Sequence, residues 1–387
     1  MKRIIVFTLA FLFFNNSFSE NKTTKIIIKN NSTLKYANEI ISVKWESIIK
    51  NNPNLTKDNF SILDEKENRI IPSQAADNDG DGKIDELLLL TSIDKFEDKT
   101  YSIITKVDTF KFEPLVSLYF QKRREDIAWE SDKIAYRIYG PALSNEVNNG
   151  IDIWCKRVRY NIVEKWYTHS EKYAKDGKDT YHQDTGEGAD FYSVGKSLGA
   201  GSAALWKNDS LYQPGVFESY RFIESGPLRV VFEVTYKSIN YDGLEVKEKK
   251  IITLDAGSNL NKIELIFESK NKKKDLFIAS GIVKRKNVKS FYDKHDKIIS
   301  LWGPVNDDPV NEFLGIGIII PGNKYFDLKD TNSHLLAICQ HNSNKNFVYY
   351  SGAGWTKNGD FKNENDWINY LKDYSRKIKN KLEIKVK

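Results

Sequence analysis

The stretch Val230-Val-Phe-Glu-Val-Thr-Tyr236 decides the fold, because its apolar side chains alternate with more polar ones. A period of two predicts a β-strand with one buried face. Residues 263–267 repeat the pattern, and turns such as Tyr241-Asp-Gly243 and Asp255-Ala-Gly257 separate the apolar runs. This spacing predicts an all-β protein built from large antiparallel sheets, as a sandwich or supersandwich, and disfavours a parallel βαβ fold.

Outward from this region, the chain divides into two parts. Its 387 residues, of which 40% are hydrophobic, suffice for one large and one small domain. We expect a small β domain over 20–113 and a large β-sandwich catalytic domain over 114–387, with the boundary near Phe112-Glu-Pro-Leu115. One C-terminal helix is expected between Glu364 and Ile378, because apolar residues recur there at helical spacing, and a final strand follows it.

The first nineteen residues have the pattern of a secretory signal peptide. Met1-Lys-Arg3 precedes an apolar run from Ile4 to Phe14, and Ser17-Phe-Ser19 fits a cleavage site. The run is too short to serve as a membrane anchor, so we expect export to the periplasm. The formal charge of +6 falls to about +4 without Lys2 and Arg3, and this balance favours no nucleic-acid partner.

The small domain carries the acidic segment Asp77-Asn-Asp-Gly-Asp-Gly-Lys-Ile-Asp85-Glu86. Acids at every second position and glycines that permit a tight turn are typical of a calcium loop. The predicted ligands are Asp77, Asp79, Asp81 and Asp85. Leu88 stands where the usual terminal Glu would be, and a solvated acidic turn is the alternative. We expect a structural calcium ion here and no cofactor for catalysis.

The segment from Tyr181 to Gly201 begins Tyr-His-Gln-Asp-Thr-Gly-Glu-Gly-Ala-Asp and has no apolar period. A loop so rich in glycine shapes a concave surface more often than a core. His182 is the candidate base, since imidazole titrates near neutral pH. Tyr136 and Tyr181 are candidate acids, although Tyr136 suits a core position equally well.

Cationic and aromatic residues precede this loop. Arg157 and Arg159 share one face of a predicted strand and could hold a carboxylate, with Lys156 out of phase with them. Trp154 and Trp166 could stack on sugar rings or fill the core, and His341 could enter the site from the far end of the chain. These residue types predict a pocket for an anionic, hydroxyl-rich ligand such as an acidic oligosaccharide.

Four motifs together resemble an uncharacterised-domain family found in bacterial polysaccharide-utilisation loci for ulvan and pectin. They are Glu130-Ser-Asp-Lys-Ile-Ala-Tyr-Arg-Ile-Tyr-Gly-Pro-Ala-Leu143, Gly150-Ile-Asp-Ile-Trp-Cys-Lys-Arg157, the loop beginning at Tyr181, and Ile252-Thr-Leu-Asp-Ala-Gly-Ser258. The likeness covers nearly the whole mature chain. It implies a link to oligosaccharide dehydratase activity.

A dehydratase of this kind removes the C5 proton of a non-reducing-end uronate, expels the 4-hydroxyl as water and leaves a 4,5-unsaturated uronyl end. Arg157 would neutralise the carboxylate, His182 would take the proton, and Tyr136 or Tyr181 would protonate the hydroxyl. The alternatives are a metal site at His182, Asp184 and Glu187, a glycoside hydrolase or polysaccharide lyase, and a non-catalytic glycan-binding protein.

Overall fold

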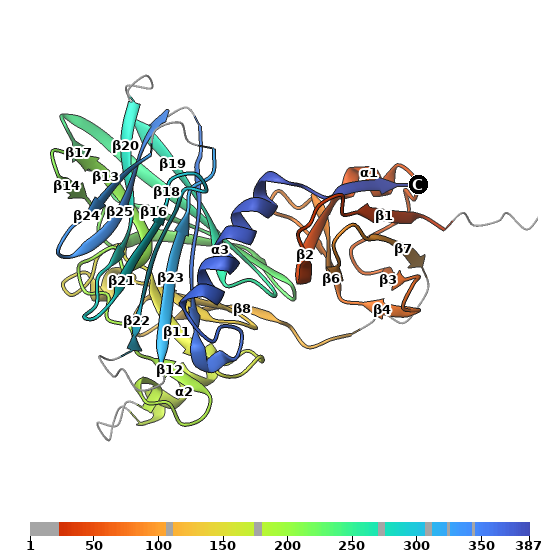
Figure 1. Ribbon diagram of the computed structural model, residues 1–387, viewed down its shortest axis with the longest axis horizontal. Helices are drawn as coiled ribbons and strands as arrows, with labels where there is room; N and C mark the ends of the chain where they lie inside the picture. Colours follow the sequence, from red (N-terminus) through yellow and green to blue (C-terminus); the bar gives the residue numbers. More distant parts are fainter. Residues whose placement is uncertain are drawn as a thin grey trace, which may run out of the picture.

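The computed structural model describes residues 23–105, 111–173, 180–269, 275–305, 312–322, 326–342 and 345–387. The predicted signal peptide lies outside these residues. Every ladder between two strands in the described part of the chain is antiparallel, and helices are few. The all-β prediction is therefore confirmed. Figure 1 shows a large unit and a smaller one, with the smaller unit at the chain termini.

The smaller unit consists of two sheets around a core of its own. The first has the order β27-β1-β7-β3-β4 and consists of Glu383–Val386, Lys25–Lys29, Asp98–Thr105, Phe60–Asp64 and Arg69–Ile71. The second has the order β2-β6-β5, over Tyr36–Lys44, Glu86–Ile93 and Ser73–Ala76, and α1 spans Trp45–Ile49. Strand β27 falls within the range predicted for the large domain, yet it pairs with β1. The first and last strands of the described chain thus pair with each other in one sheet.

The large unit is built on a nine-stranded sheet. The alternating stretch Val230–Tyr236 forms most of β16, Arg229–Tyr236, and Val230, Phe232 and Val234 face the core. The sheet order is β15-β16-β18-β19-β26-β23-β22-β21, with β17 beside β18. In the same order the strands span Phe217–Ser225, Arg229–Tyr236, Leu244–Asp255, Leu260–Ser269, Phe347–Trp355, Phe313–Ile319, Ile298–Pro304 and Lys289–Asp293, with β17 at Ile239–Tyr241.

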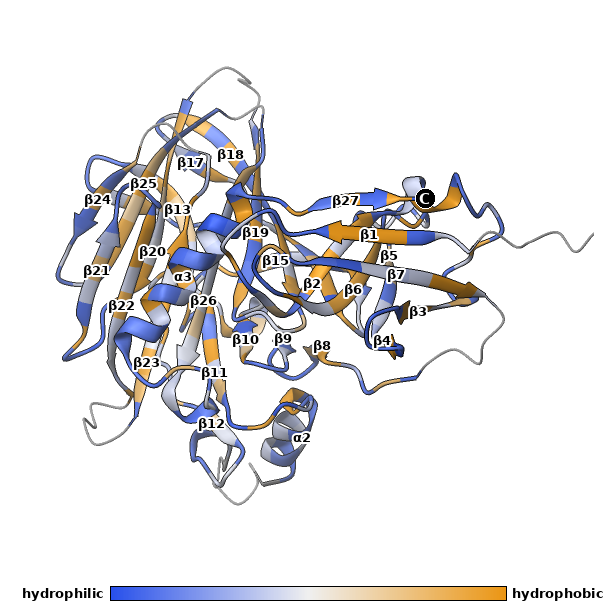
Figure 2. Ribbon diagram, turned by 45° about the vertical axis from the view of Figure 1, so that its right-hand side comes forward, coloured by the Kyte–Doolittle hydropathy of each residue, from blue (hydrophilic) through white to orange (hydrophobic). Residues whose placement is uncertain are grey.

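Two five-stranded sheets cover one face of this sheet, since a single core cluster draws buried side chains from all three. The first has the order β14-β13-β20-β25-β24, over Ser210–Tyr212, Ala200–Lys207, Asp275–Val283, His334–Asn342 and Asp327–Asp330. The second has the order β12-β11-β10-β9-β8, over Gly188–Asp190, Asp152–Lys156, Ala135–Ile138, Asp126–Ser131 and Val116–Gln121. In Figure 2, hydrophobic residues follow these strands and hydrophilic residues gather at the turns.

The predicted C-terminal helix is confirmed as α3, Glu364–Lys379, with the Asn363 side chain accepting a hydrogen bond at its N-terminus. It packs on the other face of the nine-stranded sheet through Trp367, Ile368 and Leu371. Gly315 and Gly317 on β23 allow the close approach. A Cβ at Gly317 would lie 2.6 Å from Leu371 Cδ1.

A second long helix, α2, spans Val163–Tyr173 and was not predicted. It lies on the outer face of the sheet β12-β11-β10-β9-β8. The buried Glu130 carboxylate on β9 accepts from the backbone N–H groups of Ile162 and Val163, which begin the helix. The carboxylate thereby satisfies amide groups that a helix start leaves unpaired.

Among the described residues, no helix combines the length and the apolar character needed to cross a membrane. Cys155 and Cys339 are both buried and free.

The contact of α3 with β23 yields a stability prediction. Gly317→Ala should lower the free energy of unfolding by about 1–3 kcal/mol, because the new methyl group has no room beside Leu371. In a Leu371→Ala background, the same change should cost much less, since the space is then open. Denaturant titration of the four proteins tests this coupling. Additive losses would show that the glycine is not needed for the helix to approach.

Candidate functional site

Alternation along three neighbouring strands places a row of charged side chains under α2. Arg137 on β10 lies opposite Asp152 on β11, and Trp154 on β11 lies opposite Asp190 on β12. Since residues opposite each other share a face, these side chains project outward from the sandwich core. Antiparallel sheets usually expose such a face to water. Here α2 and the 3₁₀ turn η3, Thr180–His182, cover it.

Arg137 is the centre of this cluster. Its Nε donates to Asp126 Oδ2 at 2.7 Å, and its Nη1 lies 3.6 Å from Asp152 Oδ2 and 4.0 Å from Asp190 Oδ2. The exposed fraction of these four side chains is 6% or less. One guanidinium thus faces three carboxyl groups in a nearly dry environment, where an unpaired charge is costly.

Aromatic rings surround the charged groups. The Arg137 guanidinium lies 4.5 Å from the Tyr139 ring centroid, and Tyr167 on α2 donates its hydroxyl to Asp126 Oδ1 at 3.0 Å. The Tyr181 ring packs against Trp154 and Tyr167 at centroid distances of 5.1 and 6.4 Å. These rings exclude water and strengthen electrostatic interactions inside the cluster.

His182 lies at the surface of the cluster, with 47% of its side chain exposed. Its Nδ1 is 3.0 Å from the Asp190 backbone carbonyl and 3.4 Å from Asp190 Oδ2. A carbonyl oxygen can only accept, so Nδ1 carries the hydrogen and Nε2 is the basic nitrogen. The ring centroid of Tyr181 is 4.3 Å away, and Arg124 Nη1 donates to the Tyr181 hydroxyl at 2.6 Å.

Burial shifts the protonation of the three aspartates. It raises the pKa of Asp190 well above the ordinary value, and the neighbouring Asp152 charge raises that pKa further. Burial also raises the pKa of Asp152 and of Asp126, against the opposing charge of Arg137. A buried acid beside an exposed imidazole is the arrangement that acid–base catalysis uses.

The two predicted arginines occupy different places. Arg157 is close to the His182 loop, because its Nη2 lies 2.5 Å from Asp184 Oδ2 and its backbone N–H donates to Glu187. Asp184 also accepts from the N–H groups of Gly186 and Gly188, so Arg157 anchors the whole turn. Arg159 instead makes a two-pronged ion pair with Asp360, at 2.9 and 2.8 Å.

Lys156 and Tyr136 are both fully enclosed. Lys156 Nζ donates to Glu130 Oε2 at 2.5 Å and to the Ser131 carbonyl, so it compensates the carboxylate that starts α2. Tyr136 projects to the opposite face of β10, where its hydroxyl donates to the Asn259 carbonyl in the sandwich core. No part of Tyr136 is exposed. This position does not suit the predicted role of a proton donor.

The remaining predicted binding residues are not brought to the surface of the cluster. Trp154 is buried beneath α2, and Trp166 lies on the buried face of α2 itself, so that their rings pack 5.8 Å apart. His341 lies at the far end of β25 from His334, packed against Phe267 and Phe347, with Nε2 near the Lys345 carbonyl. Of the predicted residues, His182 and Tyr181 lie next to each other. Arg157 contacts the loop that connects His182 to β12.

Sequence reasoning missed Arg137, Asp126, Asp152 and Tyr139. The alternation in residues 133–139 does place Arg137 and Tyr139 on one face and Tyr136 on the other. The sequence predicts a catalytic role for Tyr136, on the opposite face from Arg137. The face that carries Arg137 is recognisable as a site because α2 covers it. Since α2 was not predicted, this face was not identified from the sequence.

The acidic loop brings together three of its four predicted ligands. Carboxylate oxygens of Asp77, Asp79 and Asp85 lie within 4.8 Å of one another, whereas Asp81 pairs with Lys83 at 3.0 Å. The loop contacts the large unit, since Arg221 donates to the Asp79 carbonyl and Arg229 to Asn78. These oxygens suit a hard cation such as calcium. We propose that such an ion would stiffen the contact between the two units.

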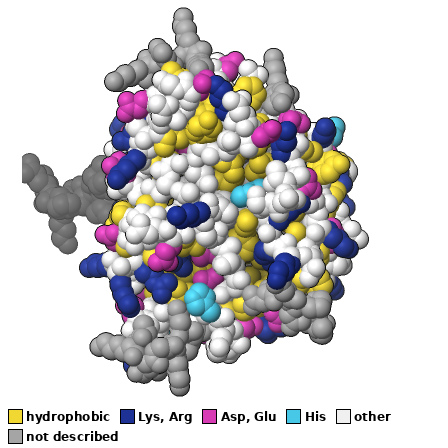
Figure 3. Space-filling view, turned by 90° about the vertical axis from the view of Figure 1, so that its left-hand side faces the viewer, with side chains coloured by type: hydrophobic (Ala, Val, Ile, Leu, Met, Phe, Trp, Pro, Cys, Tyr) yellow, Lys and Arg dark blue, Asp and Glu magenta, His cyan; other side chains and the backbone are white. Residues whose placement is uncertain are grey.

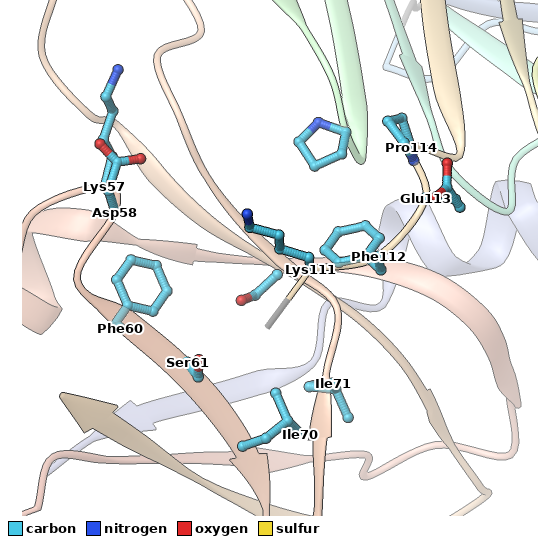
Figure 4. Close-up of a pocket in the computed structure, with 12 residues that line it drawn as sticks. Lys57, Asp58, Phe60, Ser61, Ile70, Ile71, Lys111, Phe112, Glu113 and Pro114 are labelled. Carbon is cyan, nitrogen blue, oxygen red and sulfur yellow. The ribbon is translucent and has the colours of Figure 1, made fainter. Parts of the chain in front are cut away.

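A cavity of about 450 Å³ lies at the junction of the two units (Figure 4). Phe60 and Ile71 of the small unit face the connecting segment at Lys111, Phe112 and Pro114 across it. None of the predicted site residues lines this cavity. We therefore assign the candidate site to the cluster around Arg137 and His182.

The fold and this site define a two-part antiparallel β protein with a covered acid–base cluster on the outer face of one sheet. The chain belongs to the family described as "Domain of unknown function (DUF4861)", whose model matches residues 28–384. The "Uncharacterized protein P7" of Formosa agariphila is 28% identical to it over 413 residues, with all of both chains covered.

Two solved structures from Enterococcus faecalis are similar to the fold. One is an alpha-mannosidase with 11% identity and a TM-score of 0.50, and the alignment covers 96% of this chain and 46% of that one. The other is a protein of glycosyl hydrolase family 38 with 10% identity and a TM-score of 0.52, covering 96% and 48%. The chain thus spans about half the length of each, and the likeness shows the fold.

Removal of metal ions tests the acidic loop. Dialysis against a chelator should lower the melting temperature, because convergent carboxylates repel one another without a cation. Added calcium should restore the melting temperature, and Asp77→Asn should remove both effects. If neither the chelator nor added calcium changes the melting temperature, the loop is a solvated turn and not a calcium site.

The raised pKa of Asp190 predicts that the stability difference between the Asp190→Asn variant and the wild-type protein grows with pH. Because the folded chain holds this proton more tightly than the unfolded chain does, stability is lost as pH rises above the unfolded pKa. Asp190→Asn should therefore raise the melting temperature more at pH 7.5 than at pH 4. Asp58→Asn, at an exposed position, is the control. An equal change at both pH values would contradict the raised pKa.

Proposed function

We propose that the protein is a carbohydrate-active dehydratase. It removes water from a uronate at the non-reducing end of acidic oligosaccharides, such as those of ulvan, and leaves a 4,5-unsaturated uronyl end. The observation that carries this proposal is the exposed His182 imidazole, whose Nδ1 is fixed by Asp190 beside the tyrosine Tyr181. A base and a hydroxyl acid so close together suit removal of a proton and a hydroxyl from adjacent carbons.

His182 is the base in this mechanism. Nε2 takes the C5 proton, the C5–H electrons form the C4=C5 double bond, and the C4–O bond breaks. Asp190 positions the ring, because its backbone carbonyl accepts a hydrogen bond from Nδ1 at 3.0 Å.

Tyr181 is the acid. Its hydroxyl accepts a hydrogen bond from Arg124, so its own proton is directed elsewhere and the guanidinium stabilises the phenolate that remains. The departing hydroxyl takes this proton and leaves as water. Transfer of the C5 proton from the imidazolium to the phenolate then restores both groups, so that the net reaction is loss of one water molecule.

The substrate carboxylate requires a cation, because the C5 proton becomes acidic only when charge on the carboxylate is neutralised. Arg124 stands beside Tyr181, and Arg157 holds the loop from the other side with 34% of its side chain exposed. A planar guanidinium binds a carboxylate through two parallel hydrogen bonds. We assign Arg124 to the carboxylate and Arg157 to the loop and the adjoining sugar.

A carbohydrate substrate is supported by the likeness of the fold to two carbohydrate-active enzymes, an alpha-mannosidase and a protein of glycosyl hydrolase family 38. The family resemblance carried by the four sequence motifs narrows this to uronyl oligosaccharides. The signal peptide pattern at residues 1–19 supports action in the periplasm.

Hydrolysis is less well supported by the carboxylates. Glu130 is buried against Lys156, and Glu187 is paired with Lys165 and with the Tyr160 hydroxyl. A hydrolase needs two carboxyl groups on either side of a scissile bond. The buried carboxyls of Asp152 and Asp190 instead face one guanidinium.

The proposal is tested with oligosaccharides of ulvan or pectin that carry a saturated uronate at the non-reducing end. The wild-type protein should generate the absorbance of an unsaturated uronate, and mass spectrometry should show loss of water without chain scission. Shorter products with new absorbance would indicate a polysaccharide lyase, and shorter products without it a hydrolase. Binding without any product would indicate a glycan-binding protein. Each of these three outcomes contradicts the proposal.

Two histidine variants locate the base. His182→Ala should lower kcat by about 10²–10⁴-fold, the usual contribution of general base catalysis, while the Kd for the oligosaccharide changes little. His295→Ala is the matched control, because its side chain is 90% exposed on a distant turn. Elimination that survives in His182→Ala would place the base elsewhere.

A further inference from the structure

A cavity of about 520 Å³ lies on the outer face of the sheet β14-β13-β20-β25-β24. Figure 3 views the side of the molecule that carries these strands, and hydrophobic side chains gather there in hollows between polar ones. Ala204, Ala279 and Ile338 lie in one row across β13, β20 and β25. Ala204 and Ala279 are fully buried in this row, and Ile338 is the member that lines the cavity.

The floor of this cavity is aromatic and apolar. Trp206 and Phe277 are partly exposed, and they pack with Ile338 in a hydrophobic cluster separate from the sandwich core. The buried Tyr241 hydroxyl donates to the Trp206 carbonyl at 2.9 Å and so fixes the backbone that carries the indole. The outer face of an antiparallel sheet is usually polar, and an apolar floor inside a polar rim is typical of a ligand site.

The rim of the cavity consists of four aspartates and two lysines, Asp209, Asp242, Asp275, Asp327, Lys207 and Lys329. Lys329 pairs with Asp209 at 3.1 Å, and Lys207 pairs with Asp242. Asp275 accepts from the Gln340 amide at 2.8 Å, and Asp327 accepts from the Leu328 N–H at 2.8 Å. Four negative and two positive charges give a formal net charge of −2, which disfavours an anionic ligand.

We propose that this cavity binds a neutral sugar unit, at a site separate from the acid–base cluster. The flat face of a pyranose presents C–H groups, which can lie against the Trp206 ring and the neighbouring Phe277. Carboxylates are acceptors only, so the aspartates select a ligand that donates hydrogen bonds, as sugar hydroxyls do. The site would retain neutral stretches of a glycan while the uronyl end reacts at His182.

Isothermal titration calorimetry with defined hexasaccharides tests the site. The neutral probes are cellohexaose, laminarihexaose, xylohexaose and mannohexaose; the acidic probe is hexagalacturonate and the cationic probe is chitosan hexamer. At least one neutral probe should bind, and Trp206→Ala should weaken its binding by tenfold or more. His182→Ala should bind it as the wild type does, so failure of the elimination reaction and failure of this site are distinguishable.

Two further variants complete the test. Asp327→Asn keeps the size of the rim side chain but removes its charge, and it should weaken the neutral probe by several-fold even if Trp206→Ala fails to fold. Tyr292→Ala removes an aromatic ring that is 57% exposed on β21, and it should leave binding unchanged. The proposal is overturned if no neutral probe binds, if the Trp206 and Asp327 variants bind normally, or if an acidic or cationic probe binds more tightly.

Discussion

Arg137 lies beneath α2 with Asp126, Asp152 and Asp190 around its guanidinium. Removing four ionisable groups from water is expensive, and the charges can stay only because each has a partner and aromatic rings fill the space between them. The contacts of this cluster connect four strands, β9 to β12, and the helix α2. It also holds Asp190, and through Asp190 the imidazole of His182, in a fixed position.

The outer face of the sheet β12-β11-β10-β9-β8 carries both buried charged residues with a structural role and charged residues that can contact a substrate. At one end of the face, Lys156 and Glu130 form a closed pair that starts α2, and neither side chain is exposed. At the other end, the pair of Asp190 and His182 reaches the surface. Burial therefore decides which charged residues hold the helix and which can meet a substrate, although all lie on neighbouring strands.

Much of the fold could be predicted from the sequence, and much less of the site. The alternation at Val230–Tyr236 predicted β16, and the helical spacing at Trp367 and Leu371 predicted α3. Pairing partners are set by tertiary packing, so the return of Glu383–Val386 to β1 was not predictable from its own pattern. For the site, the sequence indicated His182 and Tyr181, because a histidine in a glycine-rich loop is a local signal. Arg137 carries no such signal, since its partners lie on three other strands and become neighbours only after folding.

The proposed mechanism requires His182 to face the C5 hydrogen of a bound uronate. A crystal structure of the Tyr181→Phe variant, soaked with a saturated uronyl oligosaccharide, measures this most directly. The mechanism predicts that C5 lies about 3–3.5 Å from His182 Nε2, a distance at which a proton can be transferred, and that the carboxylate contacts Arg124. An oligosaccharide bound with its uronate away from His182 would contradict it.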